Sequence, residues 1–339
     1  ACAPQRYDYD IRVRILDASK RALCRLRGVQ SADVIPYGSF VSGFYNSRSD
    51  LDLALVGYVH KSELKGPPDE GADPSAEWVQ LCHADRSYKV GVLRRAAALL
   101  IGAGIASREG VEYRTHARIP LIKFTDTLSG IECDLTLGGD GVDFKASVFA
   151  QLSRVSPCFG PLYRLVKLVA KAHAMNDGST HTFNSHCLAL LTVLHLQTLS
   201  PQPLMPPLYQ LFYGQRPDAS APRLLEKGVN ASCADALRVV TQRVEGAAQE
   251  YGARTAPLSQ LLHSFITSIG ATLRQSLEQP QRRLSLSAWY GEVQEGGGAG
   301  SASGGGRYAL VVEEPFHRGD NCARTFGTLE DTPWSLYYA

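Results

Sequence analysis

The segment that most constrains the fold is residues 38–55, GSFVSGFYNSRSDLDLAL, in which a Gly-Ser pair precedes an alternation of acidic and apolar residues. Leucines alternate with other residues along 51–55, which predicts a half-buried strand. Side chains two positions apart in a strand point to the same side. Asp50 and Asp52 should therefore project together from one face of a sheet, opposite the leucines.

Two carboxylates held this closely have two interpretations. Their repulsion raises the pKa of one or both unless a cation lies between them. A hard divalent ion such as Mg²⁺, which prefers oxygen ligands, removes that repulsion. The simpler alternative is a strand with a solvated acidic face. The Asp50–Asp52 pair by itself does not separate the two.

The Gly-Ser pair in front of the carboxylates favours the metal-binding interpretation. Gly38 allows backbone N–H groups to approach an anion, and the Ser39 hydroxyl can donate to it. Ten residues, 40–49, lie between this pair and Asp50, which is room for a helical turn that returns the chain to the same edge. A combined phosphate and metal site is expected there.

Such a site needs a third carboxylate to hold a second metal ion and to take a proton from an attacking hydroxyl. The alternating segment 131–137, IECDLTL, offers Asp134 on a predicted strand. Glu132 lies on the same face and is the rival candidate. Spacing alone does not separate them.

The 339 residues, 44% of them hydrophobic, suffice for two domains. The first region mixes helices with strands, and the chain from 144 onward is mostly helical, which predicts an α+β class with domains at 31–143 and 144–339. The Gly/Ser-rich segment 296–306 is expected to be a flexible loop. The predicted helices are 8–27, 86–104, 144–154, 159–175, 184–199, 233–252 and 257–277, and the predicted strands 34–37, 51–55, 111–115, 119–125, 131–137 and 308–312.

Charge and cysteine content exclude little. A net charge of +2 is compatible with nucleic acid or a small substrate, because a local basic groove can bind phosphates. The eight cysteines form no C-x-x-C pair, so reduced thiols in a cell are expected rather than structural zinc. Residues 1–30 show no signal-peptide core, and no apolar run approaches the ~20 residues of a membrane span. A protein without a membrane segment is expected.

The motifs together resemble the DNA polymerase β-type nucleotidyltransferase superfamily, and within it the template-independent RNA nucleotidyltransferases. These are the non-classical poly(A) polymerases and terminal uridylyltransferases. After G-S-x₁₀-D-L-D, residues 117–124, ARIPLIKF, resemble the family's A-R-V-P-I-I-K-F strand. Residues 165–171, LVKLVAK, resemble its V-K-x-W-A-K helix. FNSH at 183–186 and EPF at 314–316, with Asp320-Asn321 following, fall where the family has L-S-S-Y and D-P-F.

The resemblance implies a polymerase β-type catalytic domain, a mainly helical poly(A)-polymerase-type domain, and an active site in the cleft between them. Residues 1–30 are then expected to pack on the helical domain. The implied reaction adds UMP from UTP to an RNA 3′-hydroxyl, with two Mg²⁺ ions (Mn²⁺ as substitute) held by Asp50, Asp52 and Asp134. The compact size is most similar to the minimal kinetoplastid uridylyltransferases. That similarity implies a mitochondrial location, with the cytoplasm as alternative, and association with an RNA-editing complex.

Several further residues acquire expected roles from the resemblance. Lys167 and Lys171, one helical turn apart, match lysines that bind the triphosphate. Ser147 matches half of an Asn-Ser pair that contacts sugar and phosphates, but Ala146 replaces the Asn. Ser185 is expected to cap the following helix, to bond a phosphate, or to do both.

The base-reading positions depart from the family pattern. His186 replaces a tyrosine that stacks on the base, and an imidazole can stack too. Glu314 takes the place of an aspartate that reads the base edge. His317 stands where many members have Glu, and Asp320 where some uridylyl-transferring members have His. Arg324 is expected to reach phosphate or RNA, or to form a surface salt bridge.

Three alternatives stay open at this level. The same chemistry with ATP would make the chain a poly(A) polymerase, and the pocket around His186, Glu314 and His317 would decide. Transfer to a small molecule is disfavoured by the matches at 165–171 and 312–324. An inactive relative that serves as an RNA-binding scaffold is disfavoured by the intact carboxylates.

Overall fold

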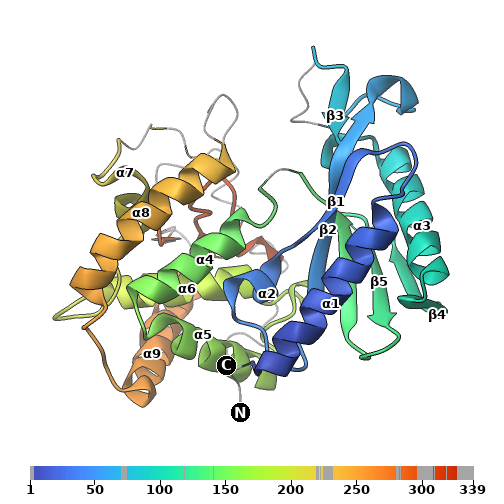
Figure 1. Ribbon diagram of the computed structural model, residues 1–339. Coiled ribbons are helices and arrows are strands. Elements are labelled where there is room, and N and C mark those ends of the chain that lie inside the picture. Colours follow the sequence, from blue (N-terminus) through green and yellow to red (C-terminus); the bar gives the residue numbers. More distant parts are fainter. Residues whose placement is uncertain are drawn as a thin grey trace. The chain divides into compact units, whose positions relative to one another are not determined.

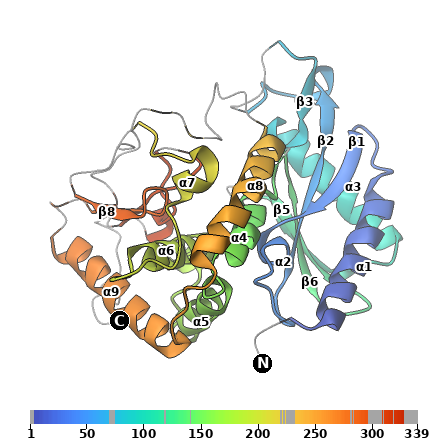
Figure 2. The same cartoon turned by 60° about the vertical axis from the view of Figure 1, so that its left-hand side comes forward.

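The protein is described from a computed structural model in which the chain forms two compact units, Ala1–Ala150 and Gln151–Ala339 (Figures 1 and 2). The boundary falls inside helix α4 (Phe144–Val155), whereas the sequence placed it just before that helix. The predicted loop 296–306 lies outside the described residues. The structure describes residues 4–69, 75–117, 119–139, 141–218, 221, 223, 232–279, 282, 284–295, 308, 310–317 and 319–326.

The first unit is built on a mixed sheet in the order β1-β2-β6-β5-β4, with β3 paired to the far end of β2. Strands β2 and β6 are parallel, and the other pairs are antiparallel. The mixed sheet confirms the predicted α+β class. The strands are β1 (Gln30–Pro36), β2 (Leu51–His60), β3 (Trp78–Gln80), β4 (Ala106–Arg114), β5 (Leu121–Asp126) and β6 (Glu132–Leu137).

One face of this sheet is covered by α1 (Arg6–Leu23) and α3 (Arg86–Gly102), as Figure 1 shows. Ile15 and Leu23 of α1 are fully buried in the same core as Leu53 of β2. The expectation that residues 1–30 pack on the helical domain is therefore wrong. The apolar stripe of α1 has its complement on the sheet, whose leucines would otherwise face water.

The second unit is mainly helical, as the sequence predicted from residue 144 onward. Helix α6 is at its centre, because the side chains from Cys187 to Gln197 are all buried. A small sheet of order β8-β7-β9 lies beside the helices. The elements of this unit are α5 (Phe159–Ala172), α6 (Ser185–Thr198), α7 (Leu208–Tyr213), α8 (Cys233–Tyr251), α9 (Leu258–Glu278), β7 (Ser285–Ser287), β8 (Glu292–Gln294) and β9 (Val311–Val312).

The described elements agree with the predicted ones wherever a long periodic pattern exists. Short elements were missed: α7 follows a proline-rich stretch, and β3, β7 and β8 have only three residues each. The turn predicted at Gly38 is the start of a five-residue helix, α2 (Gly38–Ser42). Short 3₁₀ helices occupy Lys61–Glu63, Leu81–His83, Gly178–Thr180 and Arg324–Phe326.

Among the described helices, none combines the length and the apolar character that a membrane crossing requires.

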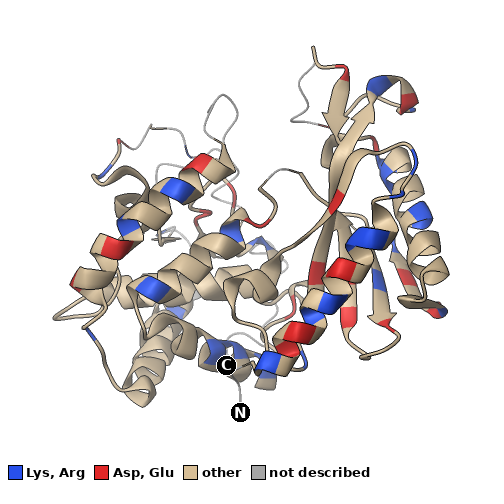
Figure 3. Ribbon diagram, in the orientation of Figure 1, with Lys and Arg blue, Asp and Glu red and all other residues tan. Residues whose placement is uncertain are grey.

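Positively and negatively charged residues lie close together in the first helix. Acidic and basic side chains alternate along α1 (Figure 3), so this helix presents no continuous basic stripe to a polyanion.

Candidate active site

Gly38 is fixed against the carboxylate of Asp52. Strand β1 ends at Pro36, and the next N–H, that of Tyr37, donates to the carbonyl of Asp52 at 3.0 Å. Gly38 itself has φ +65°, and a Cβ built on it would lie 2.1 Å from Asp52 Oδ2. Both the left-handed backbone and the missing side chain are therefore required here.

Ser39 places a polar atom in the same neighbourhood. Its carbonyl accepts the N–H groups of Phe44 and Tyr45 at 2.9 and 3.2 Å, which closes the chain after α2. Its hydroxyl oxygen is buried and finds no hydrogen-bond partner among the described residues. A buried hydroxyl without a partner costs free energy, which a ligand oxygen could recover.

The three predicted carboxylates lie together on the two central strands of the sheet, β2 and β6, and just before β2. The parallel pairing of β2 with β6 puts Asp52 directly beside Asp134, and Asp50 immediately precedes β2. Carboxylate oxygens of all three lie within 4.8 Å of one another. Asp50 is exposed, whereas Asp52 and Asp134 are half-buried. Glu132 is exposed and lies outside this group, so the structure favours Asp134 over its rival.

Lys123 is a functional candidate that the sequence analysis did not single out. It lies opposite Asp134 in the β5–β6 register, and its Nζ is 3.1 Å from Asp134 Oδ1. Burial raises the pKa of Asp134, and the charges of Asp50 and Glu132 act in the same direction, while Lys123 opposes them. Lysine thus supplies a protein cation to a group of anions. The sequence signal was the lysine of ARIPLIKF, a segment that resembles a family strand and precedes IECDLTL.

Arg12 is the second residue that sequence analysis missed. Its side chain is fully buried, and its guanidinium donates to the carbonyls of Asn46 and Ser49 and lies over the ring of Tyr45. Burial lowers the pKa of Arg12, against the charges of nearby Asp8 and Asp50. The detectable signal was an arginine on the apolar stripe of α1, in step with Ile15.

Ser147, in α4, has a local partner. Its Oγ lies 3.4 Å from Asp143 Oδ2, and its N–H donates to the Asp143 carbonyl at 2.9 Å. The position does not test the sugar-contact role that the resemblance implies. That role stays a prediction.

The remaining predicted residues belong to the second unit. On α5, Lys167 is half-buried and Lys171 is exposed, one turn apart as predicted. Ser185 begins α6, but the helix cap is Asn184, whose side chain accepts the N–H of Cys187 at 2.9 Å. The capping alternative for Ser185 is therefore wrong, and its hydroxyl instead lies 3.4 Å from polar atoms of Asn176.

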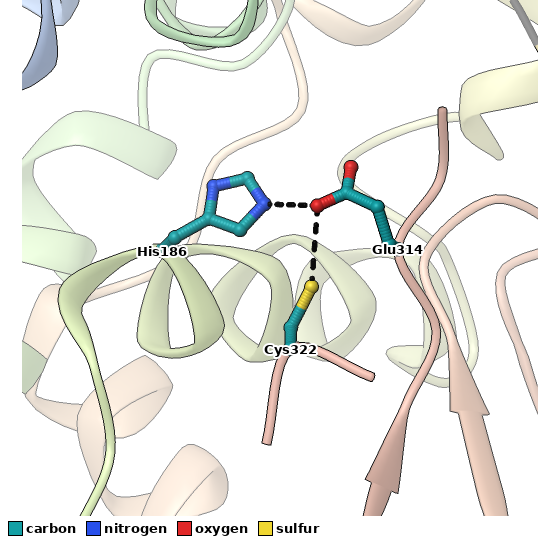
Figure 4. Close-up of side chains that lie close together, drawn as sticks. All are labelled: His186, Glu314 and Cys322. Carbon is teal, nitrogen blue, oxygen red and sulfur yellow. Dashed lines mark hydrogen bonds and ion pairs between the residues drawn. The ribbon is translucent and has the colours of Figure 1, made fainter. Parts of the chain in front are cut away.

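His186 and Glu314, two residues assigned to the base, lie in contact (Figure 4). His186 Nε2 is 2.9 Å from Glu314 Oε2, and the same oxygen accepts from Cys322 Sγ at 3.3 Å. Glu314 is almost fully buried, with 2% of its side chain exposed, whereas His186 is 27% exposed. The carboxylate thus holds one edge of an imidazole that stays partly open to solvent.

The last two base-reading candidates lie beyond Glu314. His317 is exposed, and its carbonyl accepts the N–H of Asp320 at 3.4 Å. Asp320 forms an ion pair with Arg324 at 3.0 Å. The surface salt bridge, one of the two alternatives for Arg324, is therefore present.

The comparisons with known proteins agree with this geometry. Residues 1–141 match the model of the central palm domain of mitochondrial-like poly(A) RNA polymerases. The chain is 26% identical over 334 residues to Protein HESO1 of Arabidopsis thaliana, a match that covers 95% of this chain and 57% of the relative. Over residues 1–141 the chain is therefore similar to the palm domain of these RNA polymerases.

Two further comparisons show the same similarity. Human poly(A) RNA polymerase GLD2 is 33% identical over 210 residues, which are 59% of this chain and 39% of that protein. The crystal structure of the Cid1 poly(U) polymerase shares the fold with a TM-score of 0.62 at 20% identity, covering 99% of this chain and 86% of that one. This chain spans between a third and three-fifths of the length of its first curated relatives.

Proposed function

We propose that the protein adds nucleotides to RNA 3′ ends without a template, with UTP as the preferred substrate and pyrophosphate as the second product. One observation carries the proposal: Asp50, Asp52 and Asp134 lie together on and next to the central strands β2 and β6, beside Gly38. Similarity to known proteins supports it, since the relatives are named poly(A) and poly(U) polymerases. An inactive scaffold would not need to maintain the close approach of Gly38 to Asp52.

The residues present fit the divalent metal that this chemistry needs. The donors are carboxylate oxygens, which suit Mg²⁺, and two of the three are half-buried, where unscreened repulsion is costly. Asp50, Asp52 and Asp134 would hold the ions. When bound, they would supply charge neutralisation at the phosphates.

The chain's own side chains have separable tasks in this proposal. Asp134 accepts the proton of the RNA 3′-hydroxyl. The buried hydroxyl of Ser39 donates to a phosphate oxygen. Lys167 and Lys171 balance the remaining phosphate charge from α5. Ser147 and Ser185 donate to the sugar and the phosphates.

Preference for UTP is the finer part of the proposal. His186 stacks on the base with its solvent-exposed ring face. Glu314 fixes the orientation of the ring through the contact with Nε2. Glu314 and His317 then contact the base edge. The likeness to a poly(U) polymerase supports this preference. The likeness to poly(A) polymerase GLD2 favours the second candidate, the same reaction with ATP.

The test is an extension assay on a labelled RNA oligonucleotide with each of the four NTPs in parallel. We expect extension with UTP to be fastest, and clearly faster extension with ATP would replace the uridylyl assignment by the poly(A) one. The double variant Asp50→Ala/Asp52→Ala should abolish extension with every NTP while its circular dichroism is unchanged. Extension retained by that variant would overturn the catalytic assignment.

The cellular setting is a separate proposal. The match to a mitochondrial-like polymerase domain supports a mitochondrial location. Membership of an RNA-editing complex rests on the resemblance to the minimal kinetoplastid uridylyltransferases alone. Imaging of the tagged protein at its native level, followed by mass spectrometry of what co-purifies, tests both. Cytoplasmic localisation of the tagged protein would contradict the mitochondrial assignment.

A further inference from the structure

Three side chains with three different donor atoms converge in the second unit. His186 Nε2, Glu314 Oε2 and Cys322 Sγ lie within 4.8 Å of one another (Figure 4). Two of the three residues are almost fully buried, with 2% of Glu314 and 4% of Cys322 exposed. The exposed part of the cluster is therefore on the His186 side. Cys322 has no role in the proposed nucleotidyl transfer.

The backbone holds these donors in place from three directions. His186 is in the first turn of α6, whose cap residue Asn184 also donates from Nδ2 to the Cys322 carbonyl at 2.8 Å. The Cys322 N–H donates to the carbonyl of Val312 at 2.9 Å, and the Glu314 N–H to that of Asp320 at 3.1 Å. The cluster is thus tied to a helix terminus and to a small sheet, which is the preorganisation that a ligand site requires.

Buried Asn321 strengthens the same segment. Its Oδ1 accepts the N–H groups of Val312 and Ala323 at 3.0 and 2.9 Å, and its Nδ2 donates to the Leu310 carbonyl at 2.8 Å. A side chain that satisfies three backbone groups fixes the loop between Glu314 and Cys322. The position of Cys322 is therefore fixed by the hydrogen bonds of its neighbour.

The separations suit a tetrahedral ion after a small expansion. Bond lengths of about 2.0–2.3 Å to nitrogen, oxygen and sulfur place tetrahedral donors about 3.3–3.6 Å apart. The present separations are 2.9 Å from His186 to Glu314 and 3.3 Å from Cys322 to Glu314. These two pairs need to open by less than about 0.5 Å, which side-chain torsions can supply. The third pair, His186 Nε2 and Cys322 Sγ, lies within 4.8 Å.

We propose that His186, Glu314 and Cys322 form a binding site for Zn²⁺, with the fourth position open on the exposed side. A mixed nitrogen, oxygen and sulfur donor set selects Zn²⁺ over Mg²⁺, whereas the all-oxygen group of Asp50, Asp52 and Asp134 has the opposite preference. On binding, Cys322 loses its thiol proton to solvent and a zinc–sulfur bond forms. His186 binds as neutral imidazole through Nε2. The two anionic ligands make the filled site neutral.

Zinc binding at this site has a consequence for nucleotide binding, and this consequence rests on the proposed function. The proposal above gives His186 and Glu314 to the base of the incoming nucleotide, so a bound zinc ion would withdraw both. Zinc would then act as an inhibitor that competes with the nucleotide, while Mg²⁺ at the carboxylates stays required. Cys322 would confer this sensitivity without taking part in the reaction.

Cobalt substitution tests the site directly, without any measurement of activity. The reduced, chelator-treated full-length protein is titrated with Co²⁺, and a thiolate-to-cobalt charge-transfer band is sought in the near ultraviolet. We expect the band in the wild type and its loss on addition of Zn²⁺. Cys322→Ser keeps a hydroxyl that can donate to Glu314, and it should lose the band and weaken Zn²⁺ binding by more than about 100-fold.

Cys24→Ser is the matched control, because Cys24 is an exposed thiol in the first unit. It should retain the band at full intensity. A wild type without the band, or a band that survives in Cys322→Ser, would overturn the zinc site. The carboxylate group cannot imitate the signal, since cobalt bound only to oxygen has no thiolate band.

The inhibitory consequence is tested separately, with extension measured at fixed free Zn²⁺ and excess Mg²⁺. Cys322→Ser should extend RNA like the wild type without zinc and should need at least about tenfold more Zn²⁺ for half-inhibition. Equal inhibition of both proteins would overturn the competition. If neither protein extends RNA at all, the proposed function fails while the cobalt result still decides the zinc site.

Discussion

The guanidinium of Arg12 donates a hydrogen bond to the carbonyl of Ser49, the residue that immediately precedes catalytic candidate Asp50. A second donor contact, to the Asn46 carbonyl at 3.1 Å, holds the other end of the same loop. One fully buried side chain of α1 therefore fixes the approach to the carboxylates from outside the sheet. We infer that Arg12 positions this loop, because it holds the Asn46 and Ser49 carbonyls.

Arg12→Met should destabilise the protein by about 3 kcal/mol, because two carbonyls lose their hydrogen bonds to a buried guanidinium. We also expect weaker Mg²⁺ binding, since Asp50 loses its anchored loop. Chemical denaturation with and without Mg²⁺ measures both effects. Arg6→Gln is the matched control on the same helix, because the Arg6 side chain is 93% exposed. A variant at Arg12 with unchanged stability would contradict the anchoring role.

Gly38→Ala should reduce extension by at least about 100-fold, because the new methyl group would occupy the space of Asp52 Oδ2. Gly43→Ala is a precise comparison. Gly43 also has a left-handed backbone, at φ +75°, but nothing lies within 4 Å of a Cβ built there. Both variants should lose about 1 kcal/mol of stability from backbone strain, and only Gly38→Ala should lose activity. Similar rates for the two would show that the contact with Asp52 is unimportant.

Lys123→Met should make the protein more dependent on Mg²⁺. The substitution removes the protein cation 3.1 Å from Asp134 and leaves the repulsion among the carboxylates uncompensated. The melting temperature without metal should fall, and the rise on adding Mg²⁺ should exceed that of the wild type. Thermal unfolding at several Mg²⁺ concentrations measures both. Lys145→Met, a change in α4, controls for loss of a lysine, and an equal shift there would refute the specific pairing.

His195 predicts a pH dependence of stability in the second unit. The ring lies between Ser264 Oγ at 3.0 Å and Ser268 Oγ at 3.2 Å, and burial lowers the pKa of His195 from 6.5 to about 4. Between these values the unfolded chain binds a proton that the folded chain does not. Stability should therefore fall as the pH decreases from 6.5 to 4, by at most about 3 kcal/mol.

His195→Gln isolates this contribution, because glutamine retains hydrogen-bonding groups and does not titrate. Denaturant unfolding at a series of pH values should give a shallower loss of stability for the variant over that window. The difference between the two curves cancels the other histidines. Parallel curves would mean that His195 is charged in the folded protein.

The carboxylate group could be predicted from the sequence because the patterns that identify its members are local. The alternation of DLDL fixes which face Asp50 and Asp52 share, and a second alternating segment supplies Asp134. The choice between Asp134 and Glu132 needed the strand register, which pairs Asp52 with Asp134. Register depends on partners more than seventy residues away, and a local pattern does not contain them.

The missed residues share a different physical origin. Arg12 and Lys123 act through tertiary contacts with segments remote in sequence, and each has an ordinary local role on a helix or a strand. Cys322 was dismissed as a metal ligand because the cysteines lack zinc-finger spacing. Its partners His186 and Glu314 come from separate elements, so sequence spacing carried no trace of the cluster.

The insertion of β6 between β2 and β5 also sets a time order for the making of the site. β6 is the last strand of the first unit to leave the ribosome, yet it occupies an interior position and carries Asp134 beside Asp52. A nascent chain that ends before residue 132 contains Asp50 and Asp52 but lacks β6, the strand that carries the third carboxylate. Such non-local pairing closes late in folding. The proposed metal-binding group is thus complete only once the sheet is complete, so a measured affinity for Mg²⁺ would report that the first unit has finished folding.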